Sequence, residues 1–207
     1  MPPLPPATQA LLLVNVAIYF LDDLLGRTLS AWFVLQPIGS SGFWPWQVVT
    51  YAFLHGSFLH LLFNMLGLWV FGSDLELDLG RRRYLALYAM SVLAGAAVHM
   101  LLSPVLAAPA AILGASGGIF GLLMAYAMRN PHRTIMLLIP PIPMKARTMA
   151  ILYGALEVWS LLPSYVPGVS VLNYLMGNVA HLAHLGGMLG AFLTLRWWQQ
   201  RPPFRRR

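Results

Sequence analysis

Six long apolar runs make up most of this chain and constrain its fold more than any other feature of the sequence. They cover Thr8–Leu25, Tyr51–Gly72, Tyr84–Leu106, Ala111–Met128, Thr148–Leu162 and Leu172–Trp197. A helix that crosses the hydrocarbon layer of a bilayer needs about 20 mostly apolar residues. Charged residues are only 9 % of the chain, against about 25 % in a typical soluble domain. The sequence therefore predicts an all-α, polytopic membrane protein with six transmembrane helices.

The connections between these runs are short, with one exception. No polar stretch is long enough to form a soluble domain, so we predict a single membrane domain over residues 1–207, with a Pro-rich N-terminal tail and an Arg-rich C-terminal tail. Residues 26–50 are too apolar for a solvated loop and too interrupted by Pro and Gly to span. Their Trp residues predict a long interfacial first loop.

The basic residues indicate an orientation in the membrane. The net charge is +7, but Lys and Arg lie in the connections and the tails, which argues against nucleic acid as a partner. With six spans, twelve of the thirteen Lys and Arg fall on one side and only Arg27 on the other. Cytoplasmic loops are enriched in Lys and Arg, so both termini are expected in the cytoplasm. The absence of a basic signal-peptide start, with this topology and size, favours a bacterial inner membrane.

Three runs carry a polar side chain at one predicted depth. Counted back from the first charged residue at the cytoplasmic end of each run, His60, Ser116 and His184 lie twelve to fourteen residues away. At 1.5 Å per residue this is roughly 18–21 Å above the inner boundary. Polar groups in lipid are costly and usually face the interior of the bundle. The shared depth predicts one site built from three helices.

Small residues in the fourth and sixth runs indicate how two of these groups meet. His184, Gly187 and Ala191 are spaced 0, +3 and +7 and form one helical stripe. Small residues allow two helices to approach closely. Docked against the face of the fourth run that carries Gly117, this stripe brings His184 within hydrogen-bond reach of Ser116. A nucleophilic serine and its general base need that geometry.

The acidic residues do not suggest a third member of this pair. Five of the six lie near the ends of runs, and Glu157 is the one expected within the membrane, where a partner such as Ser160 is its simplest role. We therefore predict a Ser–His dyad with no carboxylate placed to orient His184. Phe120, one turn after Ser116, is expected to hold the His184 ring by stacking.

The second run carries His60 and Asn64 on one helix face, because they are spaced i, i+4. Two interpretations remain open for this pair. It forms hydrogen bonds between helices that satisfy its own polar groups, or it donates hydrogen bonds to an oxyanion.

These motifs resemble those of the rhomboid family of intramembrane serine proteases. The matching elements are Gly114-x-Ser116-Gly117, His55-x4-His60-x3-Asn64, Ala183-His184-x2-Gly187, Glu76-x3-Gly80 and the aromatic first loop. The resemblance implies a six-helix bundle in which Ser116 is the nucleophile and His184 the general base and acid. It implies an oxyanion hole made by His60, Asn64 and the backbone N–H of Ser116. Supporting roles would fall to Gly114, Gly117, Phe120 and His55, and His55 would support the first loop.

The resemblance also implies a substrate class. Family members cut single-pass membrane proteins in or near their transmembrane segments, within the lipid bilayer and without a metal or cofactor. Three positions depart from the family pattern. Trp46-Gln47 stands where Trp-Arg is frequent, Phe120 where some members have Tyr, and Ala191 where Gly is common. None of them removes a reacting group.

Three other functions fit this sequence less well. A metalloprotease would need its ligands among the histidines, but the chain has no HExxH motif and no cysteine. A channel or transporter would need more intramembrane charge than Glu157. A non-catalytic rhomboid-like protein that binds membrane clients remains the main alternative, although such a protein is expected to have lost Ser116 or His184.

Overall fold

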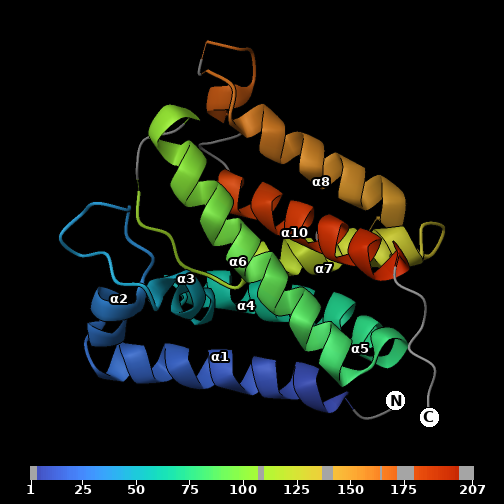
Figure 1. The fold of residues 1–207 in the computed structure, drawn as a ribbon, viewed down its shortest axis with the longest axis horizontal. Helices are drawn as coiled ribbons and strands as arrows, with labels where there is room; N and C mark the ends of the chain where they lie inside the picture. Colours follow the sequence, from blue (N-terminus) through green and yellow to red (C-terminus); the bar gives the residue numbers. More distant parts are fainter. Residues whose placement is uncertain (1–3, 107–109, 137–141, 164, 172–179, 201–207) are drawn as a thin grey trace.

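The computed structural model describes residues 4–106, 110–136, 142–163, 165–171 and 180–200 of the chain, and it is mostly helical (Figure 1). The α-helices are α1 (Pro6–Leu24), α2 (Thr28–Phe33), α3 (Gln47–Thr50), α4 (Phe58–Gly67), α5 (Ser73–Leu79), α6 (Arg81–Leu106), α7 (Ser116–Arg129), α8 (Ala146–Ser160) and α10 (His181–Gln200). A 3₁₀ turn, η1 (Tyr51–Phe53), precedes α4, and a π-helical turn, η2 (Leu68–Gly72), joins α4 to α5. Strands β1 (Thr134–Met136) and β2 (Pro143–Lys145) pair antiparallel between α7 and α8.

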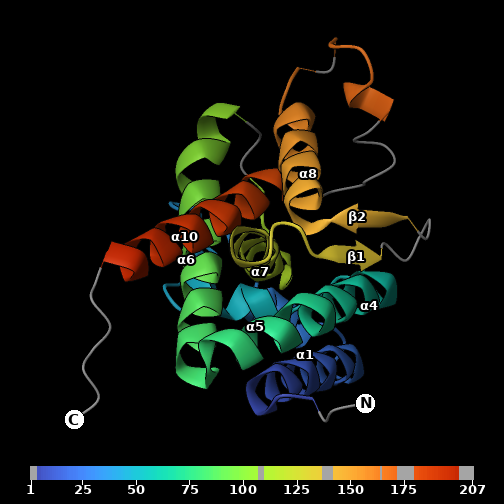
Figure 2. The ribbon, with the colours of Figure 1, turned by 90° about the vertical axis from the view of Figure 1, so that its right-hand side faces the viewer.

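Helix α7 lies at the centre of the bundle. Figure 2 shows it almost end-on, with α4, α6, α8 and α10 around it. Nine of its fourteen residues are buried, so it is apolar on nearly every side, as a central helix must be. At 1.5 Å per residue, α7 is about 21 Å long, which is shorter than the hydrocarbon layer of about 30 Å.

Three of the predicted spans overlap helices that are long and apolar enough to cross a membrane. Within the described part of the chain these are Pro6–Leu24, the continuous helix Phe58–Leu79, and Arg81–Leu106. The remaining helices in the predicted runs are shorter or less apolar, and the first part of the sixth run, residues 172–179, lies outside the described residues. The number of transmembrane helices therefore stays a prediction.

The boundaries of the second and fourth runs were predicted wrongly. The helix of the second run begins at Phe58 because Ser57 caps it, its hydroxyl accepting the backbone N–H of His60 at 3.2 Å. It continues beyond Gly72 to Leu79 and ends where Gly80 adopts a φ of +75°. The helix of the fourth run begins only at Ser116, because the preceding segment is extended and Ile112 pairs with Leu35 of the first loop.

The first loop is held together by Gln47, the residue that stands where the family often has Arg. Its side chain is fully buried. The amide Nε2 donates to the carbonyl oxygens of Trp32 and Gly42 at 3.1 and 2.9 Å. The amide Oε1 accepts the N–H groups of Gln36 and Trp44 at 3.1 and 3.2 Å. One glutamine therefore ties four backbone positions of the loop, including those beside two exposed Trp side chains.

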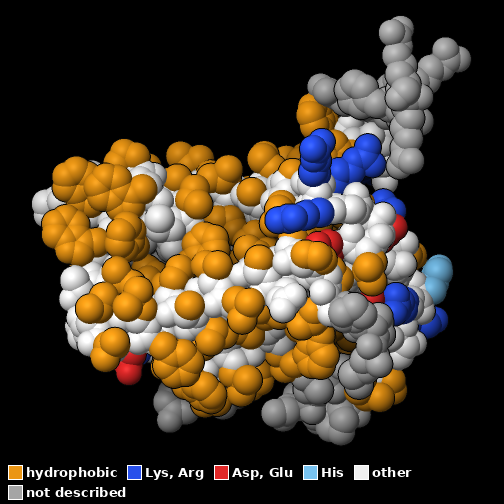
Figure 3. All heavy atoms as spheres, turned by 90° about the horizontal axis from the view of Figure 1, so that it is seen from below, with side chains coloured by type: hydrophobic (Ala, Val, Ile, Leu, Met, Phe, Trp, Pro, Cys, Tyr) orange, Lys and Arg blue, Asp and Glu red, His pale blue; other side chains and the backbone are white. Residues whose placement is uncertain are grey.

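The surface divides into apolar and charged regions. Figure 3 shows apolar side chains over most of one face of the molecule, with most of the Lys and Arg on that face near one end. Ion pairs lie at the C-terminal end of α7, where Arg129 Nη2 donates to Asp78 Oδ1 at 2.9 Å and Arg133 approaches Asp74 at 3.1 Å. An apolar surface with charge gathered at one end is what a protein embedded in lipid requires.

A buried carboxylate joins α1 to α5. Glu76 on α5 accepts the backbone N–H groups of Ala7 and Thr8 at 2.9 and 2.7 Å, and the Thr8 hydroxyl at 2.8 Å. These N–H groups belong to the first turn of α1 and have no acceptor within their own helix. The negative charge also interacts favourably with the positive end of the helix dipole. This contact gives the Glu76-x3-Gly80 motif a structural role.

We expect the substitution Glu76→Gln to lower the free energy of unfolding by about 1–3 kcal/mol, because a buried N–H of α1 then faces an NH₂ group that cannot accept it. Thermal unfolding of the purified protein in detergent measures the change. Asp78→Asn is the matched control, since Asp78 lies on the same helix but is partly exposed, and it is expected to cost less than about 1 kcal/mol. Equal effects of the two substitutions would contradict the capping role.

Candidate active site

A sharp turn places Ser116 at the first position of α7. Gly114 adopts a φ of +123°, which is strained for any residue with a side chain, and its N–H donates to the Tyr51 carbonyl oxygen at 2.9 Å. The chain then enters α7 directly at Ser116. The N–H groups of a first helical turn have no intrahelical acceptor, and the helix dipole favours negative charge there. Negative charge that develops beside Ser116 would therefore meet free donors.

The same glycine brings His60 against this turn. A Cβ at Gly114 would lie 2.8 Å from both Cε1 and Nε2 of the His60 ring and 3.7 Å from Ser116 Oγ. Only a residue without a side chain leaves room for the imidazole, so Gly114 shapes the site both through its backbone and through the missing Cβ. His60 thus lies beside Ser116, although the two are 56 positions apart in the sequence.

Glycines bring α10 directly onto α7. A Cβ at Gly187 would overlap the backbone carbonyl oxygen of Gly117, and one at Gly121 would lie 2.9 Å from the carbonyl oxygen of Gly187. The stripe that the spacing of the sixth run predicts therefore faces the fourth run. His184 lies one turn before Gly187 on α10, which places its ring level with the start of α7.

The imidazole of His184 contacts the Ser116 hydroxyl. His184 Nε2 and Ser116 Oγ are 2.7 Å apart. The Phe120 ring stacks on the His184 ring, with centroids 4.1 Å apart and planes 7° from parallel. Because the serine, the histidine and the phenylalanine come from only two helices, their geometry depends directly on the α7–α10 packing.

The expectation that no carboxylate is placed to orient His184 is wrong. Glu157 of α8 lies with Oε1 at 2.9 Å from His184 Nδ1 and Oε2 at 2.6 Å from His181 Nδ1. Its side chain is 1 % exposed. The contact joins a third helix to the Ser116–His184 pair. A usable signal was present in the sequence, because His181 and His184 are spaced i, i+3 and so share a helix face, and Glu157 is a carboxylate in an apolar run.

Asn64 and His55 both contact His60. The Asn64 amide donates to the His60 carbonyl oxygen at 2.8 Å, within its own helix. The buried His55 ring meets the His60 ring edge to face, with centroids 5.1 Å apart. The His55 carbonyl oxygen accepts a hydrogen bond from Arg27 at 2.9 Å, which links this cluster to the start of the first loop.

Four of the polar residues predicted for the site open onto one cavity of about 890 Å³. It lies between α4, α7 and α8, and its lining includes His60, Asn64, Ser116 and His184. Apolar and aromatic side chains, among them Tyr153 of α8, make up most of the remaining wall. Within the described part of the chain, no group of three or more His, Asp or Glu side chains could hold a metal ion.

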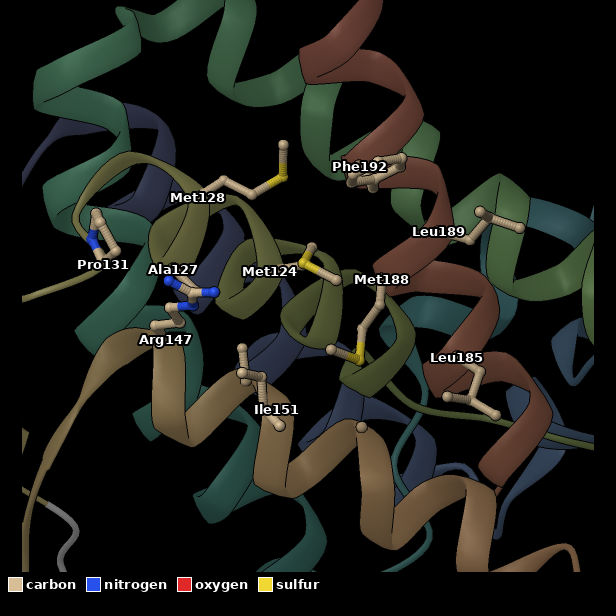
Figure 4. A pocket seen from close by; sticks show the side chains of 12 residues that line it. Met124, Ala127, Met128, Pro131, Arg147, Ile151, Leu185, Met188, Leu189 and Phe192 are labelled. Carbon is tan, nitrogen blue, oxygen red and sulfur yellow. The ribbon is translucent and has the colours of Figure 1, made fainter.

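A second cavity, of about 720 Å³, lies on the other side of α8, between α7, α8 and α10. In Figure 4 the side chains of Met124 and Met188 extend into the space between these helices, and Arg147 stands near one end. The described residues that line it include no serine and no histidine, so the candidate chemistry belongs to the first cavity.

The sequence is similar to those of known proteins. Residues 41–198 match the Rhomboid domain family. The chain is 34 % identical over 185 residues to the mitochondrial rhomboid protein 1 of Saccharomyces cerevisiae, covering 87 % of this chain and 49 % of that protein. It is 29 % identical over 197 residues to the rhomboid protease GlpG of Serratia proteamaculans, covering 92 % of this chain and 63 % of the relative. It is 30 % identical over 154 residues to the putative rhomboid protease YdcA of Bacillus subtilis, covering 74 % and 67 %. The chain thus spans about half to two thirds of the length of these relatives.

Proposed function

Because the chain belongs to the rhomboid family, we propose that it is an intramembrane serine protease that hydrolyses peptide bonds in or near the transmembrane segments of membrane proteins. The chain is an integral membrane protein, as its family and its long apolar helices indicate. The proposal extends to one domain of six transmembrane helices in a bacterial inner membrane, with both termini in the cytoplasm and single-pass proteins as substrates.

One observation carries this proposal: Ser116 Oγ lies 2.7 Å from His184 Nε2 at the wall of a cavity between helices. A serine hydroxyl is a weak nucleophile until a neighbouring base accepts its proton. The Phe120 ring restricts the imidazole to one plane. A pair that served only to satisfy its own hydrogen bonds would have no need of an adjoining cavity.

The reaction would proceed in two steps. Ser116 Oγ attacks the carbonyl carbon of the scissile bond while its proton passes to His184 Nε2. His184 then protonates the leaving amine as the C–N bond breaks, which leaves an acyl group on Ser116. A water molecule then attacks the acyl carbon while its proton passes to His184 Nε2. His184 returns that proton to Ser116 Oγ as the second product leaves. No metal and no cofactor take part.

Three donors near Ser116 support a role in stabilising the oxyanion. The backbone N–H of Ser116 lies in the first turn of α7, where helix N–H groups lack partners. His60 lies beside Gly114, and Asn64 lines the same cavity, with one of its two amide protons engaged by the His60 carbonyl. Preorganised donors of this kind are worth about 10²–10³-fold each in kcat in serine hydrolases.

Reconstituted protein in liposomes tests the proposal with a single-pass reporter that carries a helix-destabilising segment. We expect wild-type protein to cut the reporter into two fragments and Ser116→Ala to cut none. Ser41→Ala, which changes an exposed serine of the first loop, is the matched control and is expected to cut like the wild type. Cleavage by Ser116→Ala would refute the assignment. A folded wild-type protein that binds the reporter and never cuts it would instead favour client binding.

A further inference from the structure

The carboxylate of Glu157 completes a chain of hydrogen bonds across three helices. It lies on α8, contacts His184 of α10 at 2.9 Å, and His184 contacts Ser116 of α7 at 2.7 Å. We propose that Glu157 is a positioning residue that holds His184 as the base of Ser116, so that the site works as a Ser–His–Glu triad. This inference rests on the proposed function, and it replaces the expected dyad.

The hydrogen-bonding capacity of each group fixes the tautomer of His184. An ionised carboxylate can only accept hydrogen bonds, so the imidazole nitrogen that contacts it must carry a proton. Glu157 Oε1 contacts Nδ1 of His184. A neutral imidazole has a single N–H, so Nε2 is then left with a free lone pair that points at the Ser116 hydroxyl. Glu157 thereby selects the one neutral form of His184 that can accept the proton of Ser116.

His181 fixes the carboxylate itself. Glu157 Oε2 accepts from His181 Nδ1 at 2.6 Å, so each carboxylate oxygen has its own imidazole donor. His181 lies at the first position of α10, three residues before His184. This second hydrogen bond prevents the carboxylate from rotating away from His184. Of these two imidazoles, it is that of His184 whose other nitrogen, Nε2, contacts the Ser116 hydroxyl.

The location of Glu157 argues against a role in packing alone. A carboxylate within a membrane helix costs free energy, and such residues usually act in the function of the protein. Its neighbours on α8 in the sequence, Val158 and Trp159, are 52 % and 45 % exposed, whereas Glu157 is 1 % exposed. The helix therefore turns its one carboxylate inward, to the side chain that the proposed reaction requires as a base.

The carboxylate acts through charge and geometry and stays ionised in every step. When His184 takes the Ser116 proton, the imidazole becomes positively charged and still donates its Nδ1–H to Glu157. The adjacent negative charge stabilises that imidazolium. When His184 gives the Nε2 proton to the leaving amine, the imidazole returns to its starting tautomer. Replacing the equivalent carboxylate in a soluble serine protease by its amide lowers kcat by about 10⁴-fold.

The test compares Glu157→Gln with the wild type in liposomes, with kcat and KM for the single-pass reporter as readouts. Glutamine keeps the shape of the side chain, loses the charge, and presents an NH₂ group to one of the two imidazoles. We expect kcat to fall by about 10²–10⁴-fold with KM nearly unchanged, because the lost interaction acts in the transition state. The thermal unfolding of both proteins in detergent shows whether the fold is retained.

His181→Asn is the matched control for the carboxylate. It removes the imidazole from Oε2 but keeps the negative charge of Glu157 beside His184. We expect its loss of kcat to be far smaller than that of Glu157→Gln. Nuclear magnetic resonance of ¹⁵N-labelled imidazoles adds an independent readout, in which the wild type shows the Nδ1–H tautomer of His184 and Glu157→Gln shows a mixture of tautomers.

Three results would overturn the inference. The first is an unchanged kcat in Glu157→Gln while the wild type cuts the reporter. The second is a loss of activity that appears as a higher KM with a lower unfolding temperature, which would assign Glu157 to packing. The third is a neutral His184 that carries its proton on Nε2 instead of Nδ1 in the wild type. If the wild type itself cuts nothing and a fluorophosphonate probe does not label Ser116, the proposed function fails and the inference fails with it.

Discussion

Replacing His184 by alanine is expected to slow the covalent labelling of Ser116 by a fluorophosphonate probe by about 10⁴–10⁶-fold, the loss that removing the base of a serine hydrolase produces. The reason is the 2.7 Å contact between His184 Nε2 and Ser116 Oγ. Without the imidazole, the hydroxyl keeps its proton and reacts no faster than an ordinary serine. The labelling rate of purified protein in detergent is the measurement, with the Ser116→Ala protein as the unlabelled reference.

A matched histidine controls for nonspecific effects of the substitution. His132 is exposed in the connection between α7 and β1, and His132→Ala is expected to label at the wild-type rate. Labelling of His184→Ala at a rate close to that of wild type would show that Ser116 is activated by some other group. Labelling that persists in Ser116→Ala would show that the probe reacts elsewhere.

The second large effect concerns the contact between α7 and α10. We expect Gly187→Ala to lower the free energy of unfolding by about 3 kcal/mol or more and to abolish labelling of Ser116. The added Cβ would overlap the Gly117 carbonyl oxygen, and no rotamer change can relieve a clash between a Cβ and a backbone atom. The two helices must separate, which carries His184 away from Ser116. Thermal unfolding and the labelling rate measure the two consequences.

Gly154→Ala is the matched control for this substitution. Gly154 also lies in a helix and also faces α10, but its Cβ would be 3.4 Å from the flexible end of the Met188 side chain. Alanine is favoured over glycine in a helix by about 1 kcal/mol, so this variant is expected to fold as well as the wild type or better. A Gly187→Ala protein that unfolds at the same temperature as Gly154→Ala would contradict the close contact.

Packing between α7 and α10 was predictable from the sequence because residues at regular spacings share one face of a helix. The spacing of His184, Gly187 and Ala191 identifies one face, and small residues on that face indicate close approach. Depth within an apolar run is similarly simple to count, since each residue adds about 1.5 Å. These two regularities are enough to predict from the sequence alone that Ser116 and His184 meet.

Features that depend on irregular backbone or on a distant partner were not predictable in this way. Hydropathy cannot distinguish the extended residues before Ser116 from the helix that follows, because both are apolar. The role of Gln47 depends on four backbone groups that converge only in the folded loop. Glu157 was assigned too simple a role because the shared helix face of His181 and His184 does not by itself show which other helix faces it. The register between α8 and α10 decides which side chains meet.

The shortness of α7 has a consequence for the supply of water to the site. Hydrolysis consumes one water molecule per bond, so a protease inside a bilayer must admit its second reactant to a region that excludes it. A helix of about 21 Å in a layer of about 30 Å leaves roughly 9 Å to be filled by something other than helix. The cavity of about 890 Å³ beside Ser116 has room for on the order of 30 water molecules. Ser116, the proposed nucleophile, therefore lies at the wall of a cavity that can hold water, and the length of α7 limits how deep into the membrane that water has to reach.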